Sequence, residues 1–390
     1  MKNFKGLLKT EFERIFANQV LLAIFIGAPI LYGFLFGYVY KQAKVVDLPV
    51  LIVDQDHSPS SDKLIDAFGD NEGLMVSEVR YTPGDIKSEM PFREYASVIT
   101  IPQDFEADIF QKRHPEIRVD LNMTNILNAN IASKNIQAVL MTMNAGIEIE
   151  GLKKKGLSPE QAKDSYESFK INFNKLYNST GNYSNFMLPG LLAAIMQQVI
   201  FLALALVFAR DFEDGYFRVL AKIKKWSVSH IWLKAVPFLI MIPVMWAVIA
   251  GFFEFFRVEA DIYNLPMLLL TILLSVASMG IGMLFSIVIP SQLKATELLM
   301  VISTPAFVLS GFTWPSMAIP AFIQGFAEII PLTHFLNGYR KVAIYGGGFS
   351  SIAHEISLLS IITVVSFLTM AVLLQIKIKR SRRNVQEEVA

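Results

Sequence analysis

The chain has 390 residues, of which 53% are hydrophobic and only 18% are charged, whereas a soluble globular domain carries about a quarter charged residues. Its 35 basic and 34 acidic residues leave a formal net charge of +1, and this balance excludes a protein that binds mainly the phosphate backbone of a nucleic acid. The absence of cysteine excludes disulfide scaffolds, thiolate metal sites and thiol nucleophiles.

Six long stretches of the chain contain no Asp, Glu, Lys or Arg. The hydrocarbon core of a bilayer requires about 20 consecutive apolar residues in a helix, far more than a soluble core helix needs. The sequence therefore predicts a polytopic α-helical membrane protein with six transmembrane helices. The uncharged stretches are residues 20–40, 188–209, 235–253, 265–289, 298–327 and 356–376.

The segment ahead of the first stretch, residues 1–18, carries apolar side chains at helical spacing. This pattern predicts an amphipathic helix that lies in the cytoplasmic interface of the membrane and leads into span 1 over residues 19–40. The apolar positions are Phe4, Leu7, Leu8, Phe12, Ile15 and Phe16.

Residues 41–184, between spans 1 and 2, have the composition of a soluble domain. They contain 16 basic and 21 acidic residues among 144, which is the charged share of an ordinary globular protein. Strand-like apolar runs begin at Leu48, Leu74, Ala96 and Ile117 and alternate with helical patterns. We therefore expect an exterior α/β domain with a helical arm.

The run DQDHSPSS from Asp54 has two interpretations. Asp54, Asp56 and His57 are residue types that bind metals, but a strand that ends in Asp before Ser, Pro and a helix is typical of turn and cap chemistry. We favour the second interpretation and assign no metal site. It predicts that Ser60 caps a helix beginning at Asp62.

The rest of the chain, residues 185–376, contains spans 2–6, and residues 210–234 within it have an informative pattern. An acidic cluster around Gly215 is followed by a basic, amphipathic helical run. A plain loop does not need so many apolar side chains, so we expect them to pack on the membrane surface or on a partner protein. The candidate coupling residues are Asp211, Glu213, Gly215, Phe217, Leu220 and Trp226.

Basic residues in short loops orient a membrane protein because they are retained on the cytoplasmic side. Four precede span 1, six lie in residues 210–234, and five lie in the basic tail of residues 377–390. The loop of residues 254–264 carries only one. We therefore expect both termini in the cytoplasm and residues 41–187 outside.

The uncharged stretch from Leu298 is too long for one crossing and is interrupted by Pro305, Pro315 and Pro320. Proline breaks helices, and broken helices at membrane depth survive only where protein or a water cavity covers their free backbone groups. We expect residues 298–313 to cross and residues 314–335 to form a re-entrant outer hairpin. Its candidate gate residues are Pro315, Pro320, Glu328 and Pro331.

Uncharged polar side chains within the spans are candidates for lining a substrate path, with hydrogen bonding between helices as the alternative role. The lack of charge in the spans argues against an ion-coupled pump and favours an amphipathic, lipid-like or drug-like substrate. The candidate path residues are Gln197, Gln198, Ser275, Ser278, Ser303 and Thr304.

The run SGFTWPSMAIPAFIQGFAEIIPLTHFLNGYRKVAIYGG from Ser310 resembles the signature of bacterial ABC type-2 exporter permeases. A Ser-Gly-Phe segment, two spaced prolines, a later Pro-Leu-Thr and a Gly-x-Arg precede the last span in both. Essentially the whole chain resembles one branch of this family, in which a large exterior domain lies between the first two spans. The resemblance implies the transmembrane subunit of an ATP-binding-cassette transporter, paired with a second permease copy or a paralogue.

The same resemblance implies that residues 210–234 form the coupling helix that meets the ATPase. Many relatives continue the acidic and glycine unit with Thr and another acid, whereas Tyr216 and Phe217 follow Gly215 here. Gly33 and Gly37 form a GxxxG pattern in span 1, which we interpret as the face toward the second permease.

No GxxxxGK[ST] motif occurs in the chain, so we expect no enzyme activity and no cofactor on it, and Mg-ATP on a separate ABC ATPase subunit. The resemblance implies ATP-driven export across the bacterial plasma (inner) membrane. The alternative is a non-transporting membrane receptor or a secretion-assembly scaffold that uses the exterior domain. A periplasmic adaptor is a further candidate partner beside the lipid bilayer, and no nucleic acid is expected.

Overall fold

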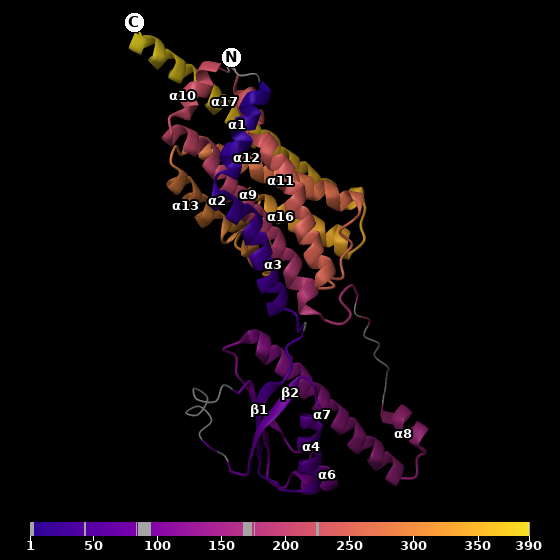
Figure 1. Ribbon diagram of the computed structural model, residues 1–390. Coiled ribbons are helices and arrows are strands. Elements are labelled where there is room, and N and C mark those ends of the chain that lie inside the picture. The colour runs from indigo at the N-terminus through magenta and orange to yellow at the C-terminus, as the bar shows by residue number, and fades with distance from the viewer. Residues whose placement is uncertain are drawn as a thin grey trace. The chain divides into compact units, whose positions relative to one another are not determined.

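The computed structural model describes residues 4–42, 44–82, 84, 95–166, 174, 176–223 and 226–389. The chain divides into two compact units (Figure 1). We call residues 1–43 with 175–390 the helical unit and residues 44–174 the inserted unit.

The inserted unit contains a four-stranded mixed sheet in the order β2-β1-β3-β4. Strand β1 runs parallel to β2 and β3, and β4 runs antiparallel to β3. The central strand β1 is buried along nearly its whole length, which accounts for its continuous apolar sequence. The strands are β1 (Leu48–Asp54), β2 (Leu74–Arg80), β3 (Ser97–Ile101) and β4 (Arg118–Leu121).

Helices of the inserted unit pack their apolar side chains against this sheet. Leu64 and Phe68 of α4 and Ile136 of α7 lie in one core cluster with Val50 and Ile99 of the strands. The described helices are α4 (Pro59–Gly69), α6 (Phe105–Gln111), α7 (Ile126–Lys154) and α8 (Pro159–Tyr166).

The start of α4 corrects one prediction. Ser58, not Ser60, is the N-cap, because its side chain accepts a hydrogen bond from the Ser61 backbone N–H. The Ser61 hydroxyl oxygen in turn accepts from the Ser58 N–H, which completes a capping box. Pro59 occupies the first helical position, where its missing N–H costs nothing.

The turn between β1 and α4 is held by the Asp54 carboxylate. It accepts hydrogen bonds from the backbone N–H groups of Asp56 and His57 and from the Ser61 hydroxyl. The favoured turn-and-cap interpretation of this run is therefore confirmed.

The helical unit contains six helical stretches, among the described residues, that are long and apolar enough to cross a membrane. The predicted class, a polytopic α-helical membrane protein, is confirmed. Several helices extend beyond the uncharged stretches because helical hydrogen bonding continues through charged residues at their ends, such as Lys234 and Lys294. The six stretches are Gln19–Val39, Tyr183–Glu213, Ser227–Phe255, Leu265–Val288, Gln292–Leu309 and Phe349–Arg383.

The first of these stretches follows α1 (Phe4–Phe16) and combines α2 (Gln19–Leu22), a π-helical segment (Ala23–Gly27) and α3 (Ala28–Val39). The fifth is interrupted at Pro305, between α13 and α14. The remaining helices are α9 (Tyr183–Glu213), α10 (Tyr216–Ile223), α11 (Ser227–Phe255), α12 (Leu265–Val288), α13 (Gln292–Ser303), α14 (Ala306–Leu309) and α17 (Ala353–Val389).

Buried side chains of α9, α11 and α12 share one apolar core, to which Leu204, Phe238 and Leu274 belong. A polar tie also joins two of these helices. The Ser286 hydroxyl oxygen of α12 accepts hydrogen bonds from the backbone N–H groups of Phe208 and Ala209 in α9, both at 2.8 Å. The end of α9 is therefore firmly attached to the bundle.

The GxxxG pair of span 1 packs within the chain. A Cβ atom at Gly33 would lie 2.2 Å from the Phe252 ring, and one at Gly37 would lie 2.0 Å from the Phe256 ring. Both rings belong to α11 or its C-cap. The interpretation of this pair as the face toward a second permease is therefore wrong, because the two glycines make room for aromatic rings of α11.

Between α14 and α17 the chain forms short helices only. A 3-10 turn (Ser316–Ala318) precedes α15 (Ala321–Ala327) and α16 (Pro331–Tyr339), which are followed by a π-helical segment (Arg340–Ile344) and a 3-10 turn (Phe349–Ile352). At seven and nine residues, α15 and α16 are each too short to cross a bilayer, which requires about 20 residues. Helix α16 is buried, whereas α15 is largely exposed.

Candidate functional site

Charged side chains from α1, α9 and α11 meet where these helices end or begin. The Lys234 Nζ atom lies 2.7 Å from the Glu11 Oε2 atom and 2.6 Å from the Asp211 Oδ2 atom. The Arg14 guanidinium lies 3.3 Å from the Asp211 carboxylate and 3.1 Å from that of Asp214. We call Glu11, Arg14, Asp211, Asp214 and Lys234 the charged cluster.

The centre of the charged cluster is buried. Glu11, Asp211 and Lys234 are each at most 2% exposed. Arg210 joins at the rim, where its Nε atom lies 3.5 Å from the Asp214 carboxylate. Removing one partner from such a buried pair costs about 3–5 kcal/mol, because the other charge is left uncompensated. The cluster therefore brings α1, α9 and α11 together at one buried point.

Helix α9 turns into α10 at Gly215. This residue has a φ of +71°, a left-handed conformation that glycine adopts without the penalty other residues meet. Asp214 is the C-cap of α9, so the reversal directly follows the charged cluster. Two of the predicted coupling residues therefore lie close together where α9 meets α10: Asp211 is in the last turn of α9, and Gly215 connects the two helices.

One face of α10 packs into the helical unit. Phe217 and Leu220 are buried, and Leu220 belongs to a small apolar cluster with Leu7 of α1 and Leu233 of α11. The Phe217 ring centroid lies 4.7 Å from that of Phe212. These two candidate coupling residues thus anchor α10 to its own chain.

Tyr216, at the start of α10, contacts the charged cluster. The Arg14 guanidinium lies 4.1 Å from the centroid of its ring, a cation–π contact. Burial, and then the nearby Glu11 carboxylate, raises the pKa of Tyr216. Its hydroxyl therefore remains neutral at physiological pH.

Helix α17 holds the other end of α10. Arg382 donates hydrogen bonds to the carbonyl oxygens of Ala221 and Lys222, at 2.6 and 3.0 Å. Gln375 accepts a hydrogen bond of 2.9 Å from the backbone N–H of Ser227, at the start of α11. Figure 1 shows α1, α10 and the C-terminal part of α17 gathered at one end of the helical unit.

The opposite face of α10 is exposed. Val219 is 50% exposed, and Trp226, which follows α10, is 73% exposed. Arg218 and Lys222 lie on the same surface. Residues 224 and 225 of the predicted coupling segment lie outside the described residues.

Glu213, another candidate coupling residue, connects α9 to α13. Its carboxylate accepts a hydrogen bond of 2.8 Å from the Gln292 backbone N–H and another from the Gln292 side-chain amide. A carboxylate at a helix N-terminus satisfies unpaired N–H groups there. Glu213 therefore caps α13 and is separate from the charged cluster.

In the part of the chain that the structure describes, the candidate path residues make separate contacts. The hydroxyls of Ser275 and Thr304 donate to the carbonyls of their own helices, each at 2.7 Å, and that of Ser303 donates at 3.4 Å. Ser278 is buried, and its hydroxyl has no hydrogen-bond partner among the described residues. Gln198 is partly exposed.

Gln197, by contrast, has a specific partner. Its buried side-chain oxygen accepts a hydrogen bond of 2.8 Å from the Leu332 backbone N–H. Leu332 is in the first turn of α16, whose N-cap side chain makes no hydrogen bond. Gln197 therefore attaches α16 to α9.

The candidate gate residues lie at the ends of the short helices. Pro320 is the N-cap of α15, Pro331 opens α16, and Pro315 precedes the 3-10 turn. Glu328 is the C-cap of α15, and its carbonyl oxygen lies 2.8 Å from the His334 Nε2 atom. The two short helices are thus joined by a side chain of α16.

Glu11, Arg14, Lys234 and Arg382 were missed as site residues. One signal was present for Glu11, because it lies on the apolar stripe of α1 between Leu7 and Ile15. A lone charge on an apolar helix face indicates a buried partner. Arg382 lies beside the exposed Arg383. For Arg14 and Lys234, the sequence shows no pattern that distinguishes them from exposed basic residues.

The six spans define a multi-pass membrane protein. The short amphipathic helix α10 packs against its helix bundle. The chain belongs to the ABC-2 family of transporter proteins, whose family model matches residues 20–372. The family resemblance of the sequence is therefore confirmed.

Three curated relatives are similar to this chain along most of its length. The probable multidrug ABC transporter permease YbhR of Escherichia coli is 21% identical over 374 residues, which cover 92% of this chain and 95% of the relative. The inner membrane transport permease YhhJ of Escherichia coli is 22% identical over 90% of each chain. The probable multidrug ABC transporter permease YbhS of Escherichia coli is 20% identical over 88% of this chain and 89% of the relative.

These relatives are permeases, which are components of a transporter and not enzymes. ATP hydrolysis therefore belongs to a separate subunit. The chain is a membrane protein with a role in transport.

Proposed function

We propose that this chain is the permease subunit of an ATP-driven exporter that moves an amphipathic, lipid-like or drug-like substrate out across the bacterial plasma (inner) membrane. It pairs with a second copy or a paralogue and with ABC ATPase subunits that bind Mg-ATP. The observation that carries the proposal is the exposed face of α10, which lies beside a buried charged cluster shared by three helices.

In this proposal the ATPase contacts Val219 of α10 and Trp226, the N-cap residue of α11. The buried face of α10 and the Arg382 hydrogen bonds keep the short helix attached to α1, α11 and α17. A displacement of α10 by the ATPase is therefore passed to the spans through Gly215 and the charged cluster. Because the cluster joins side chains of α1, α9 and α11, these helices are proposed to move together.

The orientation proposal places α10 and both termini in the cytoplasm. The basic residues of the segment before span 1, of residues 210–234 and of the tail support it. The Tyr40 and Tyr183 ring centroids, next to the ends where the inserted unit joins α3 and α9, lie 5.5 Å apart. Because α10 follows the other end of α9, the inserted unit is proposed to lie outside, where a periplasmic adaptor would meet it.

A path for the substrate is proposed next to α9 and α13, with Gln198 and Thr304 as its polar contacts. Both side chains are at least partly exposed in the single chain, whereas Gln197, Ser275, Ser278 and Ser303 are buried. Helices α15 and α16 are proposed to close the path at the outer face as a re-entrant gate. The long uncharged stretches within the spans suit an apolar or amphipathic substrate.

The coupling proposal is tested by co-purification with candidate ABC ATPase subunits. Trp226→Ala and Val219→Asp are expected to lower the recovery of the ATPase at least fivefold and to reduce substrate-stimulated ATP hydrolysis. Trp314→Ala removes another exposed tryptophan, which is 56% exposed, and serves as the matched control. Unchanged association in both the Trp226→Ala and the Val219→Asp variant would contradict the proposal.

The orientation is tested by labelling single cysteines, because the natural chain has none. Lys222→Cys places one thiol in α10, and Ser316→Cys places one in the 3-10 turn before α15, both at exposed positions. An impermeant maleimide applied to intact cells is expected to label only the Ser316→Cys variant. Labelling of only the Lys222→Cys variant would reverse the proposed orientation.

A further inference from the structure

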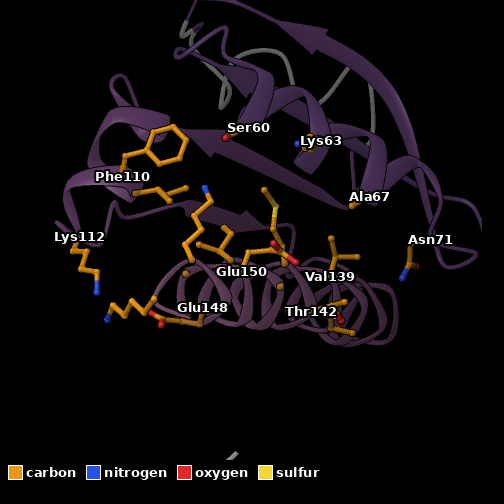
Figure 2. A pocket seen from close by; sticks show the side chains of 18 residues that line it. Ser60, Lys63, Ala67, Asn71, Phe110, Lys112, Val139, Thr142, Glu148 and Glu150 are labelled. Carbon is orange, nitrogen blue, oxygen red and sulfur yellow. Dashed lines mark hydrogen bonds between the residues drawn. The ribbon is translucent and has the colours of Figure 1, made fainter. Parts of the chain in front are cut away.

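The inserted unit contains a cleft between α7 and the pair α4 and α6 (Figure 2). Its volume is about 800 Å³, within the roughly 300–1,000 Å³ of sites that take small-molecule ligands. A second hollow of about 210 Å³ shares Ile109, Lys112, Met143, Ile147 and Glu148 with it and continues past Phe105. The cleft is therefore elongated.

The floor of the cleft is apolar. Ala67 of α4, Ile109 of α6 and Val139 of α7 line it together with Met143 and Ile147. Phe110 stands at its edge and is 69% exposed. Such a floor suits an aliphatic chain, because burial of apolar surface is favourable by about 25 cal/mol per Å².

The rim of the cleft carries unpaired positive charge. Figure 2 shows Lys63 and Lys112 on the side of α4 and α6, and Lys154 and Lys155 also line the cleft. Within the described residues, no ion pair is formed by Lys63, Lys112 or Lys155. The Lys154 Nζ atom lies 5.9 Å from the Phe110 ring centroid.

The acidic side chains of the cleft do not balance these lysines. Glu150 is paired outside the lining, because its carboxylate lies 2.7 Å from the Lys153 Nζ atom. That hydrogen bond also lowers the pKa of Glu150. Among the described residues that line the cleft, Glu148 is the one carboxylate without an ion pair, and four lysines stand against it. The rim therefore attracts an anion.

Two glycines of α7 keep the cleft open. A Cβ atom built at Gly146 or Gly151 would have no other atom within 4 Å, so packing does not require glycine at either position. Glycine in a helix interior weakens the helix relative to alanine. A larger side chain at these positions would enter the cleft, because both residues line it.

We propose that this cleft binds an amphiphilic anion, with its single apolar chain on the floor and its carboxylate or phosphate head at the lysine rim. The volume of about 800 Å³, the apolar floor and the lysine rim favour a small amphiphile over a protein segment. The site lies wholly in the inserted unit and is independent of the coupling proposal for α10.

The full chain in phosphatidylcholine nanodiscs tests this assignment. Thr142→Cys, on an exposed position at the cleft, carries a fluorescent bimane group as a reporter of occupancy. Decyl phosphate and decanoate are titrated against decyltrimethylammonium, which has the same chain and the opposite charge. We expect a saturable spectral change with one or both anions and at least tenfold weaker binding of the cation. The stronger anion identifies the head group.

Variants separate binding from folding. Gly146→Leu is expected to abolish the anion response while the thermal midpoint is kept or raised, and Lys112→Gln with Lys155→Gln is expected to weaken binding at least fivefold. Gln137→Leu, at an exposed position of α7 away from the cleft, is the matched control. Equal binding of the cation, an unchanged response in Gly146→Leu, or a response only to an acidic amphipathic peptide would overturn the proposal.

Discussion

The Lys234 Nζ atom lies 2.6 Å from the Asp211 Oδ2 atom, and both side chains are buried. Asp211 is in the last turn of α9, while Lys234 is in the third turn of α11, on the far side of α10. This ion pair therefore links the two ends of residues 212–233, the segment that contains Gly215 and α10. Movement of α10 relative to either helix acts directly on this pair.

Lys234→Met is expected to destabilise the helical unit by about 3–5 kcal/mol, because Glu11 and Asp211 are left buried without their shared cation. The measurement is thermal or denaturant unfolding of the purified chain in detergent. Lys222→Met, at an exposed position of α10, is the control and is expected to have little effect. Adding Asp211→Asn to Lys234→Met should recover part of the loss, and strict additivity of the two changes would contradict direct coupling.

Gly215→Ala is expected to cost about 1–2 kcal/mol, because the left-handed backbone disfavours a Cβ atom. The space around the residue is open, with no atom within 4 Å of the added Cβ, so the cost is conformational. Gly215→Asn should be milder, since asparagine tolerates this conformation better. Unfolding measurements on the two variants check the order, and equal stability of Gly215→Ala and the natural chain would contradict the assigned φ.

Arg382→Ala is expected to release the end of α10 by removing two hydrogen bonds from a charged donor, each worth about 1.5–3 kcal/mol. Hydrogen–deuterium exchange of the amides in residues 216–223 should become at least tenfold faster. Lys379→Ala removes an exposed basic residue of the same helix and is the matched control. Similar exchange in both variants would show that Arg382 does not hold α10.

Gln197→Leu and Gln198→Leu test whether Gln197 stabilises the fold while Gln198 contacts the substrate. Gln197→Leu leaves the Leu332 N–H without its acceptor, and an unsatisfied buried group costs about 1–3 kcal/mol. Gln198→Leu removes a partly exposed amide and is expected to change transport more than stability. The paired measurements are the unfolding midpoint and the export rate of a lipid-like dye, and a stable Gln197→Leu variant would contradict its contact with α16.

Periodicity and charge were sufficient to predict the spans, because a bilayer excludes charged side chains over a fixed length. The boundaries were less well predicted, since Lys234 and Lys294 lie inside helices whose charged ends are not part of the apolar stretch. The α4 cap was displaced for a similar local reason, because Pro59 allowed the helix to begin before the predicted cap at Ser60.

The candidate site was also predicted only in part from the sequence. The glycine and the apolar pattern of residues 210–234 were sufficient to predict a short helix after a break, and α10 follows Gly215. The pattern did not reveal which apolar residues are buried: Phe217 and Leu220 face the bundle, whereas Val219 and Trp226 face outward. That division depends on which neighbouring helices cover α10.

The sequence by itself determined the membrane class, the family and the place of the short helix after α9, since each depends on local composition or on a contiguous motif. Only the tertiary structure decided that Glu11, Asp211 and Lys234 share one buried site, because they are separated by up to 223 positions along the chain. It likewise decided that Gly33 and Gly37 accommodate the rings of α11. Pairing between distant residues follows from how helices pack, and a single sequence carries no local signal for it.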